Sequence, residues 1–178
     1  MNKDLSALVA ADGWELTHNP GNAASSNLGA HCVHDWVQAK ARKWNVISFQ
    51  FGLHDLGYDT ERISVEQYTA LLSNITAELA AVQAATQCKL LWVKTTPVPT
   101  VPEYGSKGCN DTRKCLNPPR FDKDVVLYNQ AADKVMAGAN AHGATIATAD
   151  LYSFVLQKCG GPGYQHCDGF QLPMVRLS

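Results

Sequence analysis

Residues 44–56 read WNVISFQFGLHDL. The stretch 45–51 is rich in β-branched and aromatic residues, which predicts a buried strand, and Gly52 lets the chain leave that strand sharply. His54 and Asp55 follow at the carboxyl edge of this strand. There His54 can point a ring N–H at a ligand, and Asp55 can hold the loop by accepting bonds from backbone amides. An ordinary polar turn would give the same pair, so both interpretations stay open.

Strand and helix patterns alternate on both sides of this segment. Strands are predicted at 13–18, 45–51, 89–95 and 144–148, and helices at 25–43, 64–86, 123–141 and directly after Asp150. This alternation indicates an α/β fold with a parallel sheet covered on both faces. The ligand site of such a sheet lies beyond the carboxyl ends of its strands. The segments that fall there are 19–26, 52–60, 95–122 and 149 onward.

Length and composition limit the classes of protein that the chain can belong to. Its 178 residues correspond to a single domain over 1–178, and a hydrophobic fraction of 46% is typical of a packed core. The net charge of −1 gives no basic footprint for nucleic acid. No apolar run reaches the roughly 18 residues that a membrane span needs. We therefore expect no nucleic acid as a partner and no membrane span.

Six cysteines are present, and no two of them form a CxxC pair. The spacing in CNDTRKC suits a local disulfide between Cys109 and Cys115, and that in CGGPGYQHC suits one between Cys159 and Cys167. The pairing of Cys32 and Cys88 is left open.

Asn74 and Asn110 each begin a glycosylation sequon. Together with the cysteine pairs they favour a secreted protein or one of the secretory pathway, although chance sequons and free thiols are the alternative. Residues 1–12 lack the long apolar core of a signal peptide. We therefore expect the N-terminus to be incomplete.

The segment around His54 resembles the third block of the SGNH (GDSL-type) hydrolases, in a branch that carries GLHD there. Other matches follow in chain order and span roughly residues 13–176. They are HNPGNAASSNLG at 18–29, TTPVP at 95–99, VLYN at 126–129, ADLY at 149–152 and QLPMVR at 171–176. The resemblance implies a three-layer α/β/α fold with a parallel, flavodoxin-like sheet.

The resemblance also implies hydrolysis of a small ester, such as an acetylated glycan, by a serine nucleophile, a histidine base and an orienting aspartate. His54 stands where the family has the Asn of its oxyanion hole, and Asp55 matches the structural Asp of the same block. Ala24 aligns with the second-block glycine whose amide binds the oxyanion, and Gly21 is the alternative. No cofactor is implied, because serine-type acyl transfer needs none.

Two blocks of the family have no counterpart in the sequence. The GDS block, with its first central strand, is absent, and MVRL at 174–177 stands where an Asp/His block is expected. Arg176 cannot serve as the base, since a guanidinium stays protonated. We therefore expect a chain truncated at both ends that is itself inactive. The alternative is a non-catalytic module that binds a glycan or a protein on the same fold.

Overall fold

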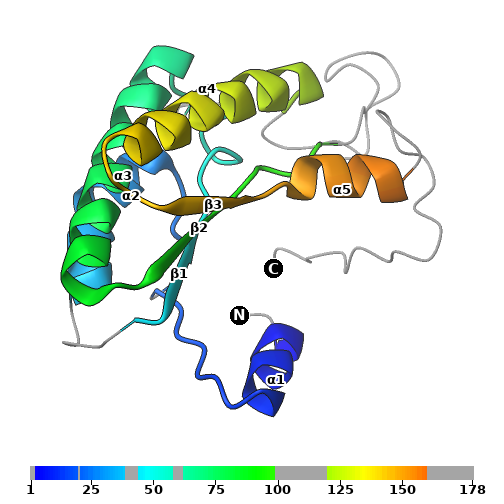
Figure 1. The fold of residues 1–178 in the computed structure, drawn as a ribbon. Coiled ribbons are helices and arrows are strands. Elements are labelled where there is room, and N and C mark those ends of the chain that lie inside the picture. Colours follow the sequence, from blue (N-terminus) through cyan, green and yellow to red (C-terminus); the bar gives the residue numbers. More distant parts are fainter. Residues whose placement is uncertain (1–2, 20, 39–43, 58–61, 99–119, 160–178) are drawn as a thin grey trace.

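The computed structural model describes residues 3–19, 21–38, 44–57, 62–98 and 120–159 (Figure 1). Its helices are α1 (Lys3–Ala11), α2 (Ser26–Gln38), α3 (Val65–Thr86), α4 (Asp122–Ala141) and α5 (Leu151–Lys158). Its strands are β1 (Val46–Phe49), β2 (Lys89–Val93) and β3 (Ile146–Ala149). No described helix is both long enough and apolar enough to cross a membrane.

The strands form one parallel sheet in the order β1-β2-β3, flanked by helices (Figure 1). Val46 lies opposite Lys89 in the first pair of strands, and Leu90 lies opposite Ile146 in the second. Helix α3 packs between α2 and α4, and α3 and α4 also contact the sheet. The predicted α/β fold with a parallel sheet is therefore confirmed.

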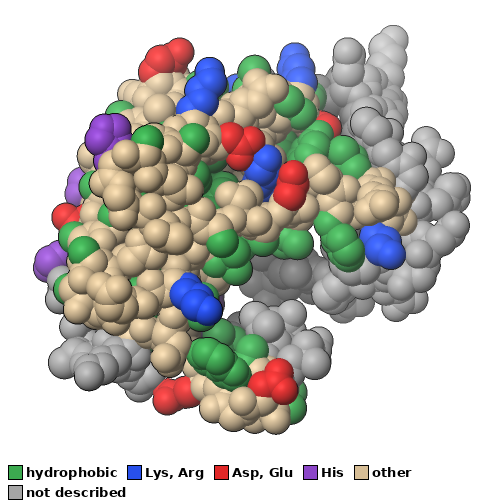
Figure 2. Space-filling view, viewed as in Figure 1, with side chains coloured by type: hydrophobic (Ala, Val, Ile, Leu, Met, Phe, Trp, Pro, Cys, Tyr) green, Lys and Arg blue, Asp and Glu red, His purple; other side chains and the backbone are tan. Residues whose placement is uncertain are grey.

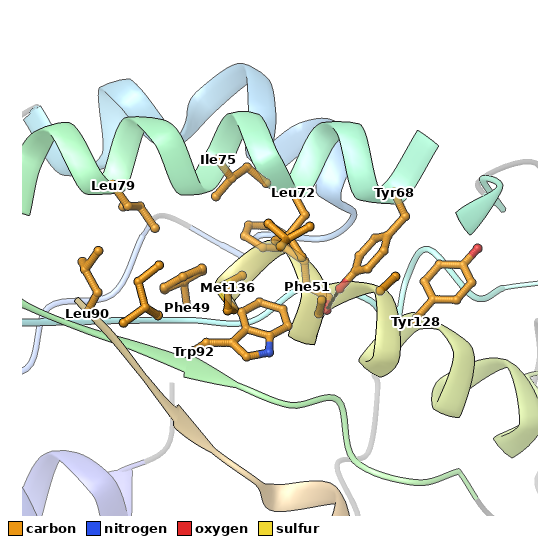
Figure 3. Packing of buried hydrophobic residues seen from close by; sticks show 14 of the residues in the cluster. Phe49, Phe51, Tyr68, Leu72, Ile75, Leu79, Leu90, Trp92, Tyr128 and Met136 are labelled. Atoms are coloured by element: carbon orange, nitrogen blue, oxygen red, sulfur yellow. Dashed lines mark hydrogen bonds between the residues drawn. The ribbon is translucent and has the colours of Figure 1, made fainter. Parts of the chain in front are cut away.

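Helix α3 supplies much of the core. Ser64 begins it with a capping box, in which the Ser64 side chain and Gln67 satisfy each other's backbone N–H groups. Leu72 and Leu79 then point from the helix toward the sheet (Figure 3), and Ile75 lies against Gly29 of α2. This apolar stripe at helical spacing explains why one helix covers the whole length of the short strands.

Aromatic side chains fill the space between this stripe and the sheet (Figure 3). The rings of Phe49 and Trp92, on neighbouring strands, have centroids 5.3 Å apart. Those of Tyr68 and Tyr128 lie 4.8 Å apart and join α3 to α4 near the carboxyl ends of the strands. Trp92 and Tyr68 are almost fully buried, so the core continues up to the loops at that edge.

The prediction of a strand at 13–18 is wrong. These residues follow α1 without strand structure, and the Trp14 side chain is 51% exposed. The alternating pattern misled the prediction because a strand also needs a partner for its backbone groups, and no described strand pairs with this segment. The outer edge of β1, where the family resemblance implies another strand, likewise has no partner among the described strands.

Acidic and basic side chains are interspersed over the face of the molecule seen in Figure 2. Lys94 shows the pattern, since its ammonium lies 2.8 Å from Asp133 and 3.5 Å from Asp150. The described residues of this face therefore present no field of a single sign to a charged partner.

Two helical glycines give a matched test of the packing. A Cβ at Gly29 in α2 would lie 2.5 Å from the Phe51 ring and 2.9 Å from Ile75 Cδ1, whereas one at Gly138 in α4 would meet nothing within 4 Å. We expect Gly29→Ala to lower the free energy of unfolding by about 1–3 kcal/mol through overpacking. Gly138→Ala should raise it by about 0.5–1 kcal/mol, because alanine is the better helix former.

Urea denaturation of both variants measures these changes. Equal effects of the two substitutions would contradict the close approach of α2 to Phe51, which follows β1, and to α3.

Candidate functional site

The candidate site lies at the carboxyl edge of the sheet, as the parallel order predicts. Gly52 forms the turn after β1, with φ of +137°. A side chain at this position would be strained by that φ, and its Cβ would lie 2.6 Å from the Thr95 hydroxyl. The Thr95 hydroxyl and the Tyr68 hydroxyl both donate to the Phe51 carbonyl, over 3.2 Å and 3.1 Å. Glycine is thus required here by the closeness of the loop after β2.

A second contact fixes that loop against α4. The Asn129 side chain accepts from the Thr95 amide over 3.0 Å and donates to the Thr95 carbonyl over 2.9 Å. Both groups are buried. The TTPVP and VLYN segments, which were noted only as separate matches, are therefore joined by a pair of hydrogen bonds at this edge.

Asp55 ties the loop after β1 to the start of α2. Its side chain is fully buried, and Oδ1 accepts from the Ser26 amide over 2.9 Å and from the Ser26 hydroxyl over 2.8 Å. Oδ2 lies 3.2 Å from the same amide. A carboxylate at a helix N-terminus is stabilised by the unpaired amides there. The expectation that Asp55 holds the loop by backbone amides agrees with this geometry.

Burial and hydrogen bonding act on the Asp55 carboxyl in opposite directions. Desolvation by burial raises its pKa, and the bonds from Ser26 lower it, so that the net pKa lies above the ordinary value of 3.8. The bonds that hold the loop therefore offset only part of the cost of burying the charge.

His54 is half-buried beside the segment that precedes α2. Its Nε2 lies 3.1 Å from Nδ2 of Asn22. The side-chain oxygen of Asn22 accepts from the Ala24 amide over 2.9 Å, which closes an Asx turn. Two contacts, Asn22 with His54 and Ser26 with Asp55, thus bring together the two segments in which the sequence resembles the second and third family blocks.

The turn before α2 has a tightly bent backbone. Gly21 and Ala24 both have positive φ, of +73° and +51°. For a residue with a Cβ this conformation costs on the order of 1–3 kcal/mol and persists only where the surroundings impose it. The Ala24 amide, which was expected as an oxyanion donor, is bonded to Asn22 in this structure.

Asn22 was missed in the sequence. It has two signals there: it lies in a run of turn-forming residues, and it stands two positions before the amide that it caps. Neither signal indicates the contact with His54, which lies 32 residues further along the chain.

Two hydroxyl groups at this edge of the sheet are held in hydrogen bonds with other groups. Those of Ser26 and Thr95 are buried and bonded to Asp55 and Phe51. The described residues also contain no group of three His, Cys, Asp or Glu side chains that could hold a metal ion. What the described part of the site offers is the ring nitrogen of His54 beside a strained turn.

The predicted disulfides and sequons fall partly outside the described residues. Cys109, Cys115, Cys167 and Asn110 lie there. Cys159 is buried at the end of α5, and its pairing with Cys167 stays a prediction. Cys32 and Cys88, whose pairing was open, are free thiols. Asn74 is exposed on α3, as a glycan acceptor needs.

A scan against protein-family models and searches of curated proteins and of solved structures found no match. The likeness to the SGNH hydrolases therefore depends on the quoted motifs alone.

The raised pKa of Asp55 predicts how stability changes with pH. The folded protein holds the Asp55 proton to a higher pH than the unfolded chain does, so this residue makes the free energy of unfolding fall as the pH rises from 3.8 through the raised pKa. Asp55→Asn keeps an oxygen for Ser26 and does not titrate. The free energy of unfolding of the wild type minus that of Asp55→Asn should therefore decrease over this range and then level off.

Urea denaturation between pH 2.5 and 8 measures the difference. Asp150→Asn is a control of opposite sign: partial burial raises the pKa of Asp150, but the Ser153 bonds and Lys94 outweigh it and lower the pKa. A difference for Asp55 that stays flat or rises with pH would contradict the net effect of burial.

Proposed function

We propose that this protein carries the oxyanion-binding part of a serine-esterase site and binds the acyl group of a small ester, such as an acetylated glycan. One observation carries the proposal. The segments that resemble the second and third blocks of the SGNH hydrolases meet at the carboxyl edge of a parallel sheet, through Asn22 with His54 and Ser26 with Asp55. Their match was made from sequence alone. A parallel sheet would bring both segments to the same edge, and the contacts of Asn22 with His54 and of Ser26 with Asp55 go beyond that shared position.

The chemistry of the proposed site follows from its donors. A neutral imidazole can donate an N–H to an ester carbonyl, and more strongly to the negative oxygen of a tetrahedral adduct. His54 supplies the ring, and Asp55 fixes the loop that carries it. The resemblance implies a second donor from the Ala24 amide, which is bonded to the Asn22 side chain in this structure, or from the Gly21 amide as the alternative.

Ester hydrolysis also needs a nucleophile and a base. The sequence has no counterpart of the family blocks that supply them, and the Ser26 and Thr95 hydroxyls are bonded to Asp55 and Phe51. For the 178-residue chain we therefore expect binding of the ester without turnover. The same observation favours the second candidate, a module that binds a glycan or a protein without catalysis.

We also propose that the protein matures in the secretory pathway. The exposed position of Asn74 on α3 supports this proposal, together with the second sequon at Asn110. In a secreting eukaryotic host, glycosidase treatment should lower the mass of the protein, and Asn74→Gln should remove one glycan. An unmodified Asn74 in secreted protein would contradict the proposal.

Phenylphosphonate, a stable mimic of the tetrahedral oxyanion, tests the binding. We expect amide shifts at residues 22–26 and 52–56 in ¹H–¹⁵N spectra of the chain titrated with it. His54→Ala should weaken the affinity about tenfold, the effect of one hydrogen bond of about 1.4 kcal/mol. His142→Ala is the control, because His142 lies at the end of α4 and bonds to Gly138.

Acetate release from an acetylated xylo-oligosaccharide, measured with the same variants, separates the candidates. Phosphonate binding without acetate release is the expected result. Acetate release that His54→Ala abolishes would show a complete esterase and contradict the expected inactivity. Absence of phosphonate binding, or equal effects of the two histidine variants, would overturn the proposed oxyanion site.

A further inference from the structure

The Asn22 side chain faces two partners of opposite kind. The Ala24 backbone N–H can only donate, so the atom that lies 2.9 Å from it is the amide oxygen of Asn22. The atom that faces His54 is therefore the NH₂ group, 3.1 Å from Nε2. The backbone N–H of Ala24 therefore fixes which way round the Asn22 amide lies.

The same logic fixes the proton on the His54 ring. An NH₂ group has no lone pair to offer, so Nε2 must accept. In a neutral imidazole the other nitrogen then carries the hydrogen, because the bond made by one nitrogen selects the tautomer. His54 is thus the Nδ1–H tautomer as long as Asn22 keeps its Asx turn.

We propose that Asn22 is a positioning residue, which holds His54 as the Nδ1–H tautomer so that the ring offers its donor to the ester oxygen from Nδ1. The use of this donor rests on the proposed function, whereas the tautomer follows from the hydrogen bonds of Asn22. Nδ1 is then the ring nitrogen that meets the ester oxygen. The turn at 21–24 orients His54 in addition to closing the loop.

Asn22→Asp is the sharpest variant. A carboxylate at this position can still accept from the Ala24 amide, so the Asx turn is kept. Toward His54, however, it can only accept, and the ring must then place a hydrogen on Nε2. Because Asn22 is exposed, the exchange leaves the core untouched.

Long-range ¹H–¹⁵N spectra of the protein labelled at histidine, recorded without ligand, read the tautomer directly. We expect Nδ1–H for His54 in the wild type and a hydrogen on Nε2 in Asn22→Asp. His142 is the internal reference: its Nδ1 lies 2.7 Å from the Gly138 carbonyl, which only accepts, so its pattern should stay Nδ1–H in both proteins. A hydrogen on Nε2 of the wild type, or a pattern unchanged by Asn22→Asp, would overturn the proposal.

Phenylphosphonate affinity tests the positioning role. Asn22→Ala should weaken binding by about three- to tenfold, and the double variant Asn22→Ala/His54→Ala should bind no more weakly than His54→Ala alone, since Asn22 acts through the ring. Additive losses would overturn the role. If the wild type binds no phosphonate, the proposed function is overturned, and so is the role of Nδ1 as a donor to the ester. The ligand-free spectra still decide the tautomer.

Discussion

The carboxylate of Asp55 connects two parts of the chain that the sheet alone would leave apart. It is fully buried and accepts from the amide and the hydroxyl of Ser26, the first residue of α2. A charge in this position is costly unless the partners stay in place, and removing one of them leaves the other unsatisfied. The loop after β1 and the start of α2 therefore hold their positions together, and the contact between Asn22 and His54 depends on that alignment.

Gly52 and Asn129 complete the support of the same loop. Gly52 lets the backbone pass within van der Waals distance of Thr95, and Asn129 binds both backbone groups of Thr95 from α4. The turn before α2, the loop after β1 and the loop after β2 are thus joined by buried hydrogen bonds, while His54 is half-buried. Because these loops support it, the His54 ring keeps its orientation and loses little side-chain freedom when a ligand binds.

Most of the fold could be predicted from the sequence because its elements carry local signals. The capping box at Ser64 and the apolar stripe of α3 gave its beginning and its buried face, and Asp150 caps α5 as expected. The segment 13–18 failed because an alternating pattern carries no information about a pairing partner. Within the site, Gly52, His54 and Asp55 were found from their order after a strand. Asn22 was not, since its contact with His54 arises only when two distant loops are brought together.

The outer edge of β1, which pairs with no strand in the described part of the chain, has a consequence for the behaviour of the protein in solution. Its residues, Val46–Phe49, include no charged side chain and no proline, and Val46 is 43% exposed. Natural sheets protect such edges with lysine, proline or a covering segment, because unpaired backbone groups accept a strand from any other chain. Association at this edge would form through backbone bonds between uncharged strands. Added salt would then do little to dissociate such assemblies, whereas dilution of the protein would dissociate them.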